Sequence, residues 1–479
     1  MQGPCDHPLT VSPAMRPTLL LCLLLTMMTP TTIARNADNP HPPAGASAPV
    51  PPPPAWLPAI DALYDAELRA PGLEDRTFTA EHWWSVATPL LTQAHGFQIE
   101  EIGRSVEDRP LRHVRWGEGK KTVLLWSQMH GDESTATMVL ADLFRFLGEH
   151  PDDARVQALR ANTTLHFFPI VNPDGAARFQ RRNAQGIDLN RDARMLATPE
   201  ARTLKALHDR VAPMYGFNLH DQRVGYRAGD SGRGTAIALL SPPYNHAADV
   251  NHVRTRAIEV AGVIRTALEP YLAGHIARWD ETFDPRAFGD LTTQWGTSTV
   301  LVEAGGIEGD LQKQRLRKLY FLGLVAALDS IASGSHAGVS PALYRELPEN
   351  GDVWPDLLVR GGTLSAPGRP PAKADLLVNF RNPLMETEGA VADVGDLGNR
   401  KARRSIDARG LFVVPIPGHA GERTVIDAND DADEGPRAPL PLTPGASARF
   451  VLSRDPQGRD VVWTLDGSVD PAAPSPPAR

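Results

Sequence analysis

Residues 122–134 read TVLLWSQMHGDES, and this stretch decides the fold of the chain around it. Its first six residues form a short apolar run that predicts a buried strand. A helical spacing of apolar residues begins near Ser134, so His130 and Glu133 lie between a strand and a helix. Open α/β sheets bind ligands at the carboxyl ends of their strands. The stretch therefore predicts an imidazole and a carboxylate at a ligand-binding edge of a sheet.

Three further apolar runs also end in polar residues. Residues 164–170, 215–220 and 298–303 read as buried strands, and they are followed or ended by Asn172-Pro-Asp-Gly, Asn218-Leu-His220 and Val302-Glu303. Strands that alternate with helical patterns favour an α/β sheet layered with helices. A single His-x-x-Glu would be a weak signal, because the chain has 15 histidines. Polar residues at four strand ends together indicate one shared crevice.

Two polar segments complete the pattern. One reads Arg181-Arg-Asn-Ala-Gln-Gly-Ile-Asp188-Leu-Asn190-Arg191, and the other, earlier one reads Ile102-Gly-Arg-Ser-Val-Glu-Asp-Arg109. In this order the motifs resemble the M14 family of zinc metallocarboxypeptidases, the carboxypeptidase A/B-like group, over residues 97–330. The resemblance implies an exported bacterial member with a mixed, mostly parallel sheet flanked by helices. It also implies hydrolysis of the C-terminal peptide bond of peptides.

The resemblance further implies a site for one Zn²⁺ per chain. His130, Glu133 and His220 stand at the positions of the family's metal ligands. This donor set suits a catalytic zinc, which takes three nitrogen or oxygen ligands from the protein and keeps one position for water. Asp188 stands at the position of the carboxylate that accepts a hydrogen bond from His130 and fixes its tautomer. An ordinary turn aspartate is the alternative interpretation of Asp188.

Four more residues receive roles from the resemblance. Glu303 is at the position of the family's general base, which activates the zinc-bound water. Arg181 is at the position of the family's arginine that polarises the scissile carbonyl. Because Arg182 is adjacent, the motif could also be aligned one residue later. Asn190 and Arg191 are at the positions of the family's pair that binds the free terminal carboxylate of a peptide substrate. Ordinary solvated arginines are the alternative.

The chain departs from the family where the substrate side chain would be recognised. Residues 280–283 contain no tyrosine to close over the substrate, and Tyr226 or Phe283 would have to replace it. The pocket determinant is expected near residues 288–291, but this motif is too altered to align, so the preferred residue stays open. An aspartoacylase-like deacylase of N-acyl amino acids and a non-catalytic protein that captures peptides or cell-wall polymers are the rival functions. The complete set of ligands with Glu303 favours the peptidase.

Composition excludes several other classes of protein. The 49 lysines and arginines against 57 acidic residues give a net charge of −8, which argues against a nucleic-acid binder. A hydrophobic fraction of 42% and a length of 479 residues exclude wholesale disorder and a single small module. His166 lies within an apolar run and is expected to be a core residue, whereas His82 beside Trp83 and Trp84 is expected to pack against them or to line a groove.

The N-terminal residues 1–34 read as a secretory signal peptide. Arg16 precedes an apolar run over residues 19–28, and small residues near Ala34 suit cleavage. This run is too short to span a bilayer, which takes about 20 apolar residues, so we expect no membrane span and export to the periplasm or the medium. We expect the natural start at Met15. Since both cysteines lie in this segment, we expect no disulfide in the mature protein.

The remaining chain divides by composition. Residues 35–58 are mostly Pro and Ala and predict an extended linker, and residues 59–335 form the expected catalytic domain, with a second helix over 311–330. Residues 340–470 predict a smaller β-rich domain, with strands over 374–380, 411–417, 448–454 and 460–465. The acidic run 427–435 fits a solvated loop better than a calcium site, and residues 471–479 are expected to form a disordered tail.

Overall fold

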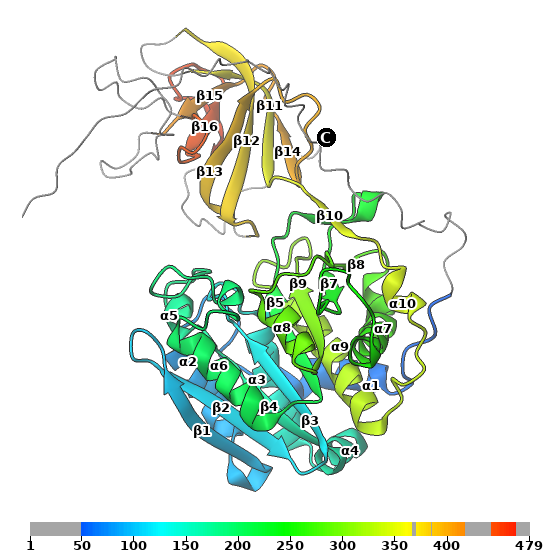
Figure 1. The fold of residues 1–479 in the computed structure, drawn as a ribbon. Coiled ribbons are helices and arrows are strands. Elements are labelled where there is room, and N and C mark those ends of the chain that lie inside the picture. The colour runs from blue at the N-terminus through cyan, green and yellow to red at the C-terminus, as the bar shows by residue number, and fades with distance from the viewer. Residues whose placement is uncertain (1–48, 366–369, 385, 417–441, 466–479) are drawn as a thin grey trace, which may run out of the picture. The chain divides into compact units, whose positions relative to one another are not determined.

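The computed structural model describes residues 49–365, 370–384, 386–416 and 442–465 (Figure 1). The predicted signal peptide, the acidic run 427–435 and the predicted tail 471–479 lie outside the described residues, as does most of the predicted linker. Among the described residues, no helix combines the length and the hydropathy that crossing a membrane requires. The domain boundaries given above stay predictions.

An eight-stranded mixed sheet forms the centre of the first part of the chain (Figure 1). In spatial order its strands are β1 (Phe97–Arg104), β2 (Pro110–Gly117), β4 (Thr163–Phe168), β3 (Lys121–Ser127), β5 (Tyr215–Asp221), β9 (Ser298–Ala304), β7 (Ile237–Leu240) and β8 (Ile276–Arg278). β4, β3, β5 and β9 run parallel to one another, β7 is parallel to β8, and the other pairs are antiparallel. The predicted mixed, mostly parallel sheet is confirmed.

The four strands predicted from the apolar runs are the four adjacent parallel strands. Parallel strands are covered on both faces, which explains why their sequences are almost continuously apolar. Because they are parallel and adjacent, their carboxyl ends meet at one edge of the sheet, and the polar residues that end the runs gather there. The predicted crevice therefore has a structural basis in the order of these strands.

Two hydrophobic cores cover the two faces of this sheet. Val123 and Leu125 of β3 face the larger core, while Leu124 and Trp126 face the other, as the alternation of side chains along a strand requires. The larger core packs β5 and β9 against α3 (Thr135–Glu149), α7 (His252–Leu272) and α9 (Gln314–Ser333). The second core packs against α6 (Pro199–Val211) and α8 (Phe288–Gln294).

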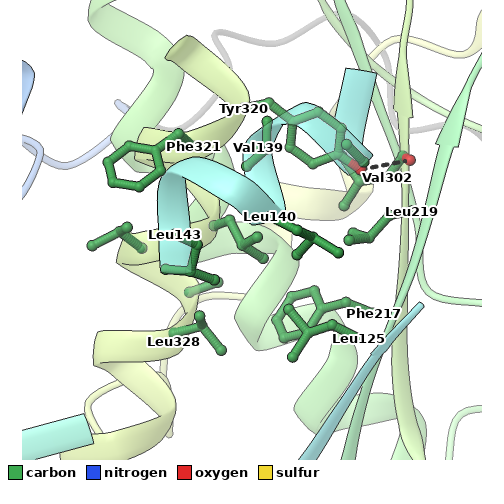
Figure 2. Packing of buried hydrophobic residues seen from close by; sticks show 14 of the residues in the cluster. Leu125, Val139, Leu140, Leu143, Phe217, Leu219, Val302, Tyr320, Phe321 and Leu328 are labelled. Atoms are coloured by element: carbon green, nitrogen blue, oxygen red, sulfur yellow. Dashed lines mark hydrogen bonds between the residues drawn. The ribbon is translucent and has the colours of Figure 1, made fainter. Parts of the chain in front are cut away.

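Figure 2 shows how side chains of α3 and α9 pack against the strands in the larger core. Leu140 of α3 lies near Phe217 and Leu219 of β5. The hydroxyl group of Tyr320 in α9 donates a hydrogen bond of 3.1 Å to the carbonyl oxygen of Val302 in β9. These contacts hold β9, the strand that contains Glu303, against the larger core. Ser134 directly precedes α3, as the apolar spacing predicts.

The remaining helices of this part are short. They are α1 (Leu57–Leu63), α2 (Ala80–Ala87), α4 (Ala154–Asn162), α5 (Pro173–Ala176), α10 (Ala342–Arg345) and the single turns η1 (Tyr64–Leu68), η2 (Thr88–Leu90), η3 (Gln93–His95), η4 (Leu189–Arg191) and η5 (Gly229–Ser231). A small antiparallel pair joins β6 (Tyr226–Ala228) to β10 (Asn350–Val353). The second predicted helix, α9, begins and ends three residues later than expected, and Gly334 ends it with a φ of 83°.

The C-terminal part is β-rich, as predicted. Its sheet contains β11 (Leu357–Leu364), β12 (Ala372–Asn382), β13 (Thr387–Gly395), β14 (Arg404–Asp407), β15 (Phe412–Pro415), β16 (Phe450–Ser453) and β17 (Val461–Leu465). Each of the four predicted runs forms a strand, whereas β11, β13 and β14 were not predicted. These strands enclose a separate core that includes Leu357, Val378, Ile406 and Phe450.

Candidate active site

Three side chains that could bind a metal ion come together at the carboxyl ends of β3 and β5. His130 and Glu133 lie in the turn between β3 and α3, and His220 lies near the end of β5. Each offers one ligand atom, and these atoms all lie within 4.8 Å of one another. The two oxygens of Glu133 are 2.7 Å from Nδ1 of His130 and 2.7 Å from Nδ1 of His220. The structure therefore brings together the three ligands expected from the sequence.

The chemistry of this buried group fits a divalent zinc ion. Two imidazole nitrogens and one carboxylate oxygen are donors that zinc accepts in catalytic sites. Burial opposes the charge of Glu133, but the imidazoles of His130 and His220 outweigh it and hold the pKa of this carboxyl well below its usual range. Nε2 of His220 has no hydrogen-bond partner among the described residues. The Nδ1 atoms of both histidines face Glu133, which leaves Nε2 of His130 for a supporting contact.

Asp188 provides that contact. Its Oδ1 is 2.9 Å from Nε2 of His130, and it also accepts a hydrogen bond of 2.9 Å from the backbone N–H of Asn190. Burial opposes the charge of Asp188, but the hydrogen bond to His130 and the nearby Arg181 lower the pKa of the carboxyl. With Asp188 ionised, Nε2 of His130 carries the proton and Nδ1 is free to bind a metal ion.

Arg181, and not Arg182, lies beside the ligand cluster. Its Nη1 is 3.1 Å from Oε1 of Glu133, and its Nε donates a hydrogen bond of 3.0 Å to Oδ2 of Asp188. Its side chain is 44% exposed, so the guanidinium group can reach a bound molecule. Arg182 instead donates to the carbonyl oxygen of Gly186 and points to solvent. The contacts therefore favour Arg181 over Arg182 for the predicted role, which stays a prediction.

Glu303 faces His220 across the β5–β9 pair, because the two residues are register partners. Its carboxyl group is buried, and Oε2 has no hydrogen-bond partner within the described part of the chain. Burial and the neighbouring carboxylates of Glu133 and Asp221 raise the pKa of Glu303 well above its usual range. A buried carboxylate with a raised pKa is suited to accept a proton and return it.

Asn190 and Arg191 follow Asp188 in the single turn η4. The side-chain oxygen of Asn190 accepts a hydrogen bond of 2.9 Å from the backbone N–H of Phe288 at the start of α8. Arg191 is 41% exposed, and its Nε lies 3.2 Å from Oδ2 of Asp284. The turn therefore places both residues beside the site, but the structure pairs Arg191 with Asp284.

Comparison with known proteins supports the predicted relationship. The sequence profile of the zinc carboxypeptidases matches residues 92–208. The predicted family resemblance is confirmed. Human cytosolic carboxypeptidase-like protein 5 is 30% identical over 140 residues, which are 28% of this chain and 15% of that protein. Carboxypeptidase E of Caenorhabditis elegans is 35% identical over 115 residues, 20% of this chain and 24% of that protein. The chain thus spans a quarter or less of the length of these two relatives.

The chain is also similar to solved structures of metallocarboxypeptidases. The metallo-carboxypeptidase of Burkholderia cenocepacia is 18% identical with a TM-score of 0.43, covering 55% of this chain and 71% of that one. Of the proposed zinc carboxypeptidase residues, His130, Glu133, Arg181, Asp188, Asn190 and Arg191 lie in the matched segment. His220 and Glu303 lie beyond it, and only the sheet brings them to the same place.

Tyr226 and Phe283 are the two aromatic residues considered as replacements for the family's capping tyrosine. Tyr226 in β6 packs against Trp279, with ring centroids 5.0 Å apart, and burial followed by the charge of Glu303 raises its pKa. Phe283 packs against His246 with a centroid distance of 5.1 Å. The ring partners of these two side chains are therefore Trp279 and His246, and not the histidines of the ligand cluster.

Residues 288–291 form the first turn of α8 and are buried. Oδ1 of Asp290 accepts a hydrogen bond of 2.9 Å from the backbone N–H of Asp284, and burial raises the pKa of Asp290 to about 7. Asp284 is the residue that pairs with Arg191. The altered motif therefore lies against the turn that carries the proposed carboxylate-binding residues.

His166 has the core position expected of it, whereas His82 is exposed and contacts a backbone carbonyl group. His166 is buried, and its Nδ1 lies 2.9 Å from Nε2 of His113. Nε2 of His82 is 2.7 Å from the carbonyl oxygen of Gly72. Sequence reasoning did miss two charged residues close to the site, Asp221 and Lys313. Asp221 could have been noticed because it directly follows His220, but Lys313 belongs to no motif.

Proposed function

We propose that this chain is an exported zinc-dependent metallocarboxypeptidase that hydrolyses the C-terminal peptide bond of peptides. The observation that carries the proposal is the convergence of His130, Glu133 and His220 with Glu303 directly opposite His220. A protein that only binds peptides needs no such proton acceptor beside a metal-binding group. The family of residues 92–208 supports the same reaction class.

The ligand group and its support prepare the site for the ion. Zinc held by His130, Glu133 and His220 would supply a Lewis acid and lower the pKa of water. Asp188 keeps the proton of His130 on Nε2, so Nδ1 presents its lone pair. The same carboxylate holds Arg181 through Oδ2. One aspartate therefore orients both a proposed ligand and a proposed catalytic cation.

Glu303 and Arg181 have different proposed roles in catalysis. Glu303 accepts the proton of the attacking water at its buried carboxylate and gives it to the leaving amine. Arg181 is exposed enough to contact the carbonyl oxygen of the scissile bond, where its positive charge acts mainly on the developing oxyanion. Its contact with Glu133 keeps this charge next to the ligand group.

Asn190 and Arg191 are proposed to bind the free terminal carboxylate of the peptide. Their turn begins at Asp188, so its position is tied to that of His130. A guanidinium group can form two parallel hydrogen bonds with a carboxylate. Because Asp284 pairs with Arg191 in this structure, the substrate carboxylate has to displace or share this partner.

Substrates with and without a free C-terminal carboxylate test the proposal. The zinc-loaded protein should release the last residue of free-acid peptides and cleave C-terminally amidated ones roughly ten- to a hundred-fold more slowly in kcat/KM, because a charge-assisted contact is worth about 1.5–3 kcal/mol. Arg191→Ala should remove this discrimination. Arg181→Ala should slow both substrates alike, since the oxyanion is common to both.

Two results would contradict the proposal and indicate another function. Equal cleavage of both peptides, or cleavage of internal bonds, would indicate an endopeptidase or an amidase on the same metal site. Hydrolysis of N-acyl amino acids without peptide cleavage would indicate the aspartoacylase-like deacylase. Export is tested separately, by the N-terminal sequence of the protein recovered outside the cytoplasm, which should begin at Arg35 if Ala34 ends the removed segment.

A further inference from the structure

A buried lysine joins the two strands that carry His220 and Glu303. Lys313 directly precedes α9 and is 1% exposed. Its Nζ donates a hydrogen bond of 2.8 Å to Oδ2 of Asp221 and one of 3.2 Å to the carbonyl oxygen of Ala304. These two acceptors belong to the residues that immediately follow His220 and Glu303. One ammonium group therefore connects the ends of β5 and β9.

The register of the strands shows why this connection bears on the site. His220 pairs with Glu303, and Asp221 pairs with Ala304 in the next row. Successive side chains along a strand point to opposite faces, so Asp221 points away from the face of His220. Lys313 consequently reaches the strand ends from the α9 side, behind the proposed active site, and competes with no substrate.

Asp221 also connects this pair of strands to the turn that carries the other two proposed ligands. Its Oδ2 accepts a hydrogen bond of 2.6 Å from Oγ1 of Thr135, and its backbone N–H donates one of 3.1 Å to Oε2 of Glu133. Arg76 lies 3.5 Å from the same Oδ2 and donates to the carbonyl oxygen of Asp132. All segments that contribute a proposed ligand or the proposed base thus meet around Asp221.

The backbone and the burial of Lys313 suggest that this arrangement is specified rather than incidental. Lys313 has a φ of 53°, in the left-handed region that costs a residue other than glycine about 1 kcal/mol or more. A buried ion pair contributes little net stability, because desolvation offsets its attraction. Both costs are borne at a position from which the ammonium group reaches β5 and β9 together.

We propose that Lys313 is a positioning residue that holds His220 and Glu303 in register for zinc binding and proton transfer. It would act through its hydrogen bonds to Asp221 and to the carbonyl oxygen of Ala304, and not as a metal ligand. The inference rests on the proposed zinc site. It extends that proposal by naming the residue that sets the distance between the ligand strand and the base strand.

The Lys313→Met variant distinguishes positioning from simple electrostatics by the sign of its effect. Lys313 lies close enough to Glu133 for their charges to interact. Removing a positive charge near a site for a divalent cation should tighten zinc binding if only the charge matters. If the residue positions the ligands, zinc binding should instead weaken by roughly ten- to a hundred-fold, as for other residues that support metal ligands.

The experiment measures zinc affinity and hydrolysis in the same preparations. The full chain is stripped of metal, zinc is titrated in competition with a chromophoric chelator, and thermal unfolding confirms that each variant is folded. Lys313→Met should lower kcat with little change in KM, because the carboxylate-binding turn is untouched. Lys318→Met is the matched control: Lys318 lies on the same helix and pairs with Asp61 and Asp65, so its loss should affect unfolding but not zinc affinity.

Zinc affinity equal to or tighter than that of the wild type in folded Lys313→Met would overturn the proposal. If this variant does not fold, Lys313→Gln, which keeps a hydrogen-bond donor, is judged by the same criterion and should weaken zinc binding to a smaller extent. The zinc titration needs no peptide substrate. A wild type that binds zinc but cleaves no peptide would refute the proposed activity. The zinc titration would still test the positioning role of Lys313.

Discussion

Replacing Asp188 by Asn should weaken zinc binding although the side chain keeps its shape. In the wild type Oδ1 of Asp188 accepts from His130 and from the backbone of Asn190, and Oδ2 accepts two contacts of 3.0 Å from Arg181. Asparagine has one oxygen and one donating amide group. If its oxygen faces His130, the amide meets the donors of Arg181; if the amide faces His130, Nδ1 of that histidine must carry the proton and cannot bind the metal ion.

The size of the effect follows from these contacts. Loss of the partner that supports a metal-binding histidine commonly weakens metal affinity by about 10–100-fold, or about 1.4–2.7 kcal/mol. The contacts of Arg181 add a further loss in kcat, because its guanidinium group is no longer fixed beside Glu133. This second loss should be the smaller one, since the side chain of Arg181 is 44% exposed and solvent screens its charge.

Competition with a chromophoric chelator measures the zinc dissociation constant of the Asp188→Asn variant. Asp192→Asn is the matched control, because Asp192 lies four residues further on and holds Ala197 and Thr198 without contacting the ligand group. The control should lose stability but keep its zinc affinity. An unchanged dissociation constant in folded Asp188→Asn would show that the contact with His130 does not set the tautomer of a zinc ligand.

Three further predictions concern the base, the core and pH. Glu303→Gln should keep zinc, as measured by metal analysis, and lose hydrolysis because an amide cannot take up the proton; a kcat near that of the wild type would remove Glu303 from this role. Asp142→Asn should lower the free energy of unfolding by about 3–5 kcal/mol in denaturant titrations, because it leaves the fully buried Arg317 without the carboxylate that lies 2.7 Å from its Nε; a loss below about 1 kcal/mol would contradict this. Burial lowers the pKa of His113 to about 4 and that of His166 to about 3, so the unfolded chain binds protons first as the pH falls below 6.5. Stability should therefore decrease from pH 6.5 towards pH 4, by up to about 1.4 kcal/mol per pH unit for each imidazole, and a double substitution of both histidines by Gln should flatten this dependence in unfolding titrations.

From the sequence alone, the four adjacent parallel strands of the central sheet and the candidate site residues could be predicted, whereas β1, β2, β7 and β8 could not. Buried parallel strands need continuous apolar runs, so residues 122–127, 164–170, 215–220 and 298–303 were recognisable as strands from local composition. His130 and Glu133 lie three residues apart in one turn, so their proximity is also a local property. The family motif then supplied the expected roles of residues such as Glu303.

Local patterns left other elements and choices open. β11, β13 and β14 of the C-terminal part were missed, because glycine and charged residues within a strand resemble those of a turn in sequence. The choice between Arg181 and Arg182 was also undecided, since neighbouring residues of one type are equivalent until the backbone directs one of them inward. The ion pair of Arg191 with Asp284 joins distant segments and has no sequence signature.

How the separate segments meet depends on tertiary packing. The register between β5 and β9 places Glu303 opposite His220, and the start of α9 brings Lys313 to Asp221 and Ala304. Periodicity reports which face of an element is buried, but it carries no information on which distant residue will face a given side chain. Contacts of this kind arise from the packing of whole strands and helices, and for that reason the sequence could provide the ligands and the base while the fold alone provided their alignment.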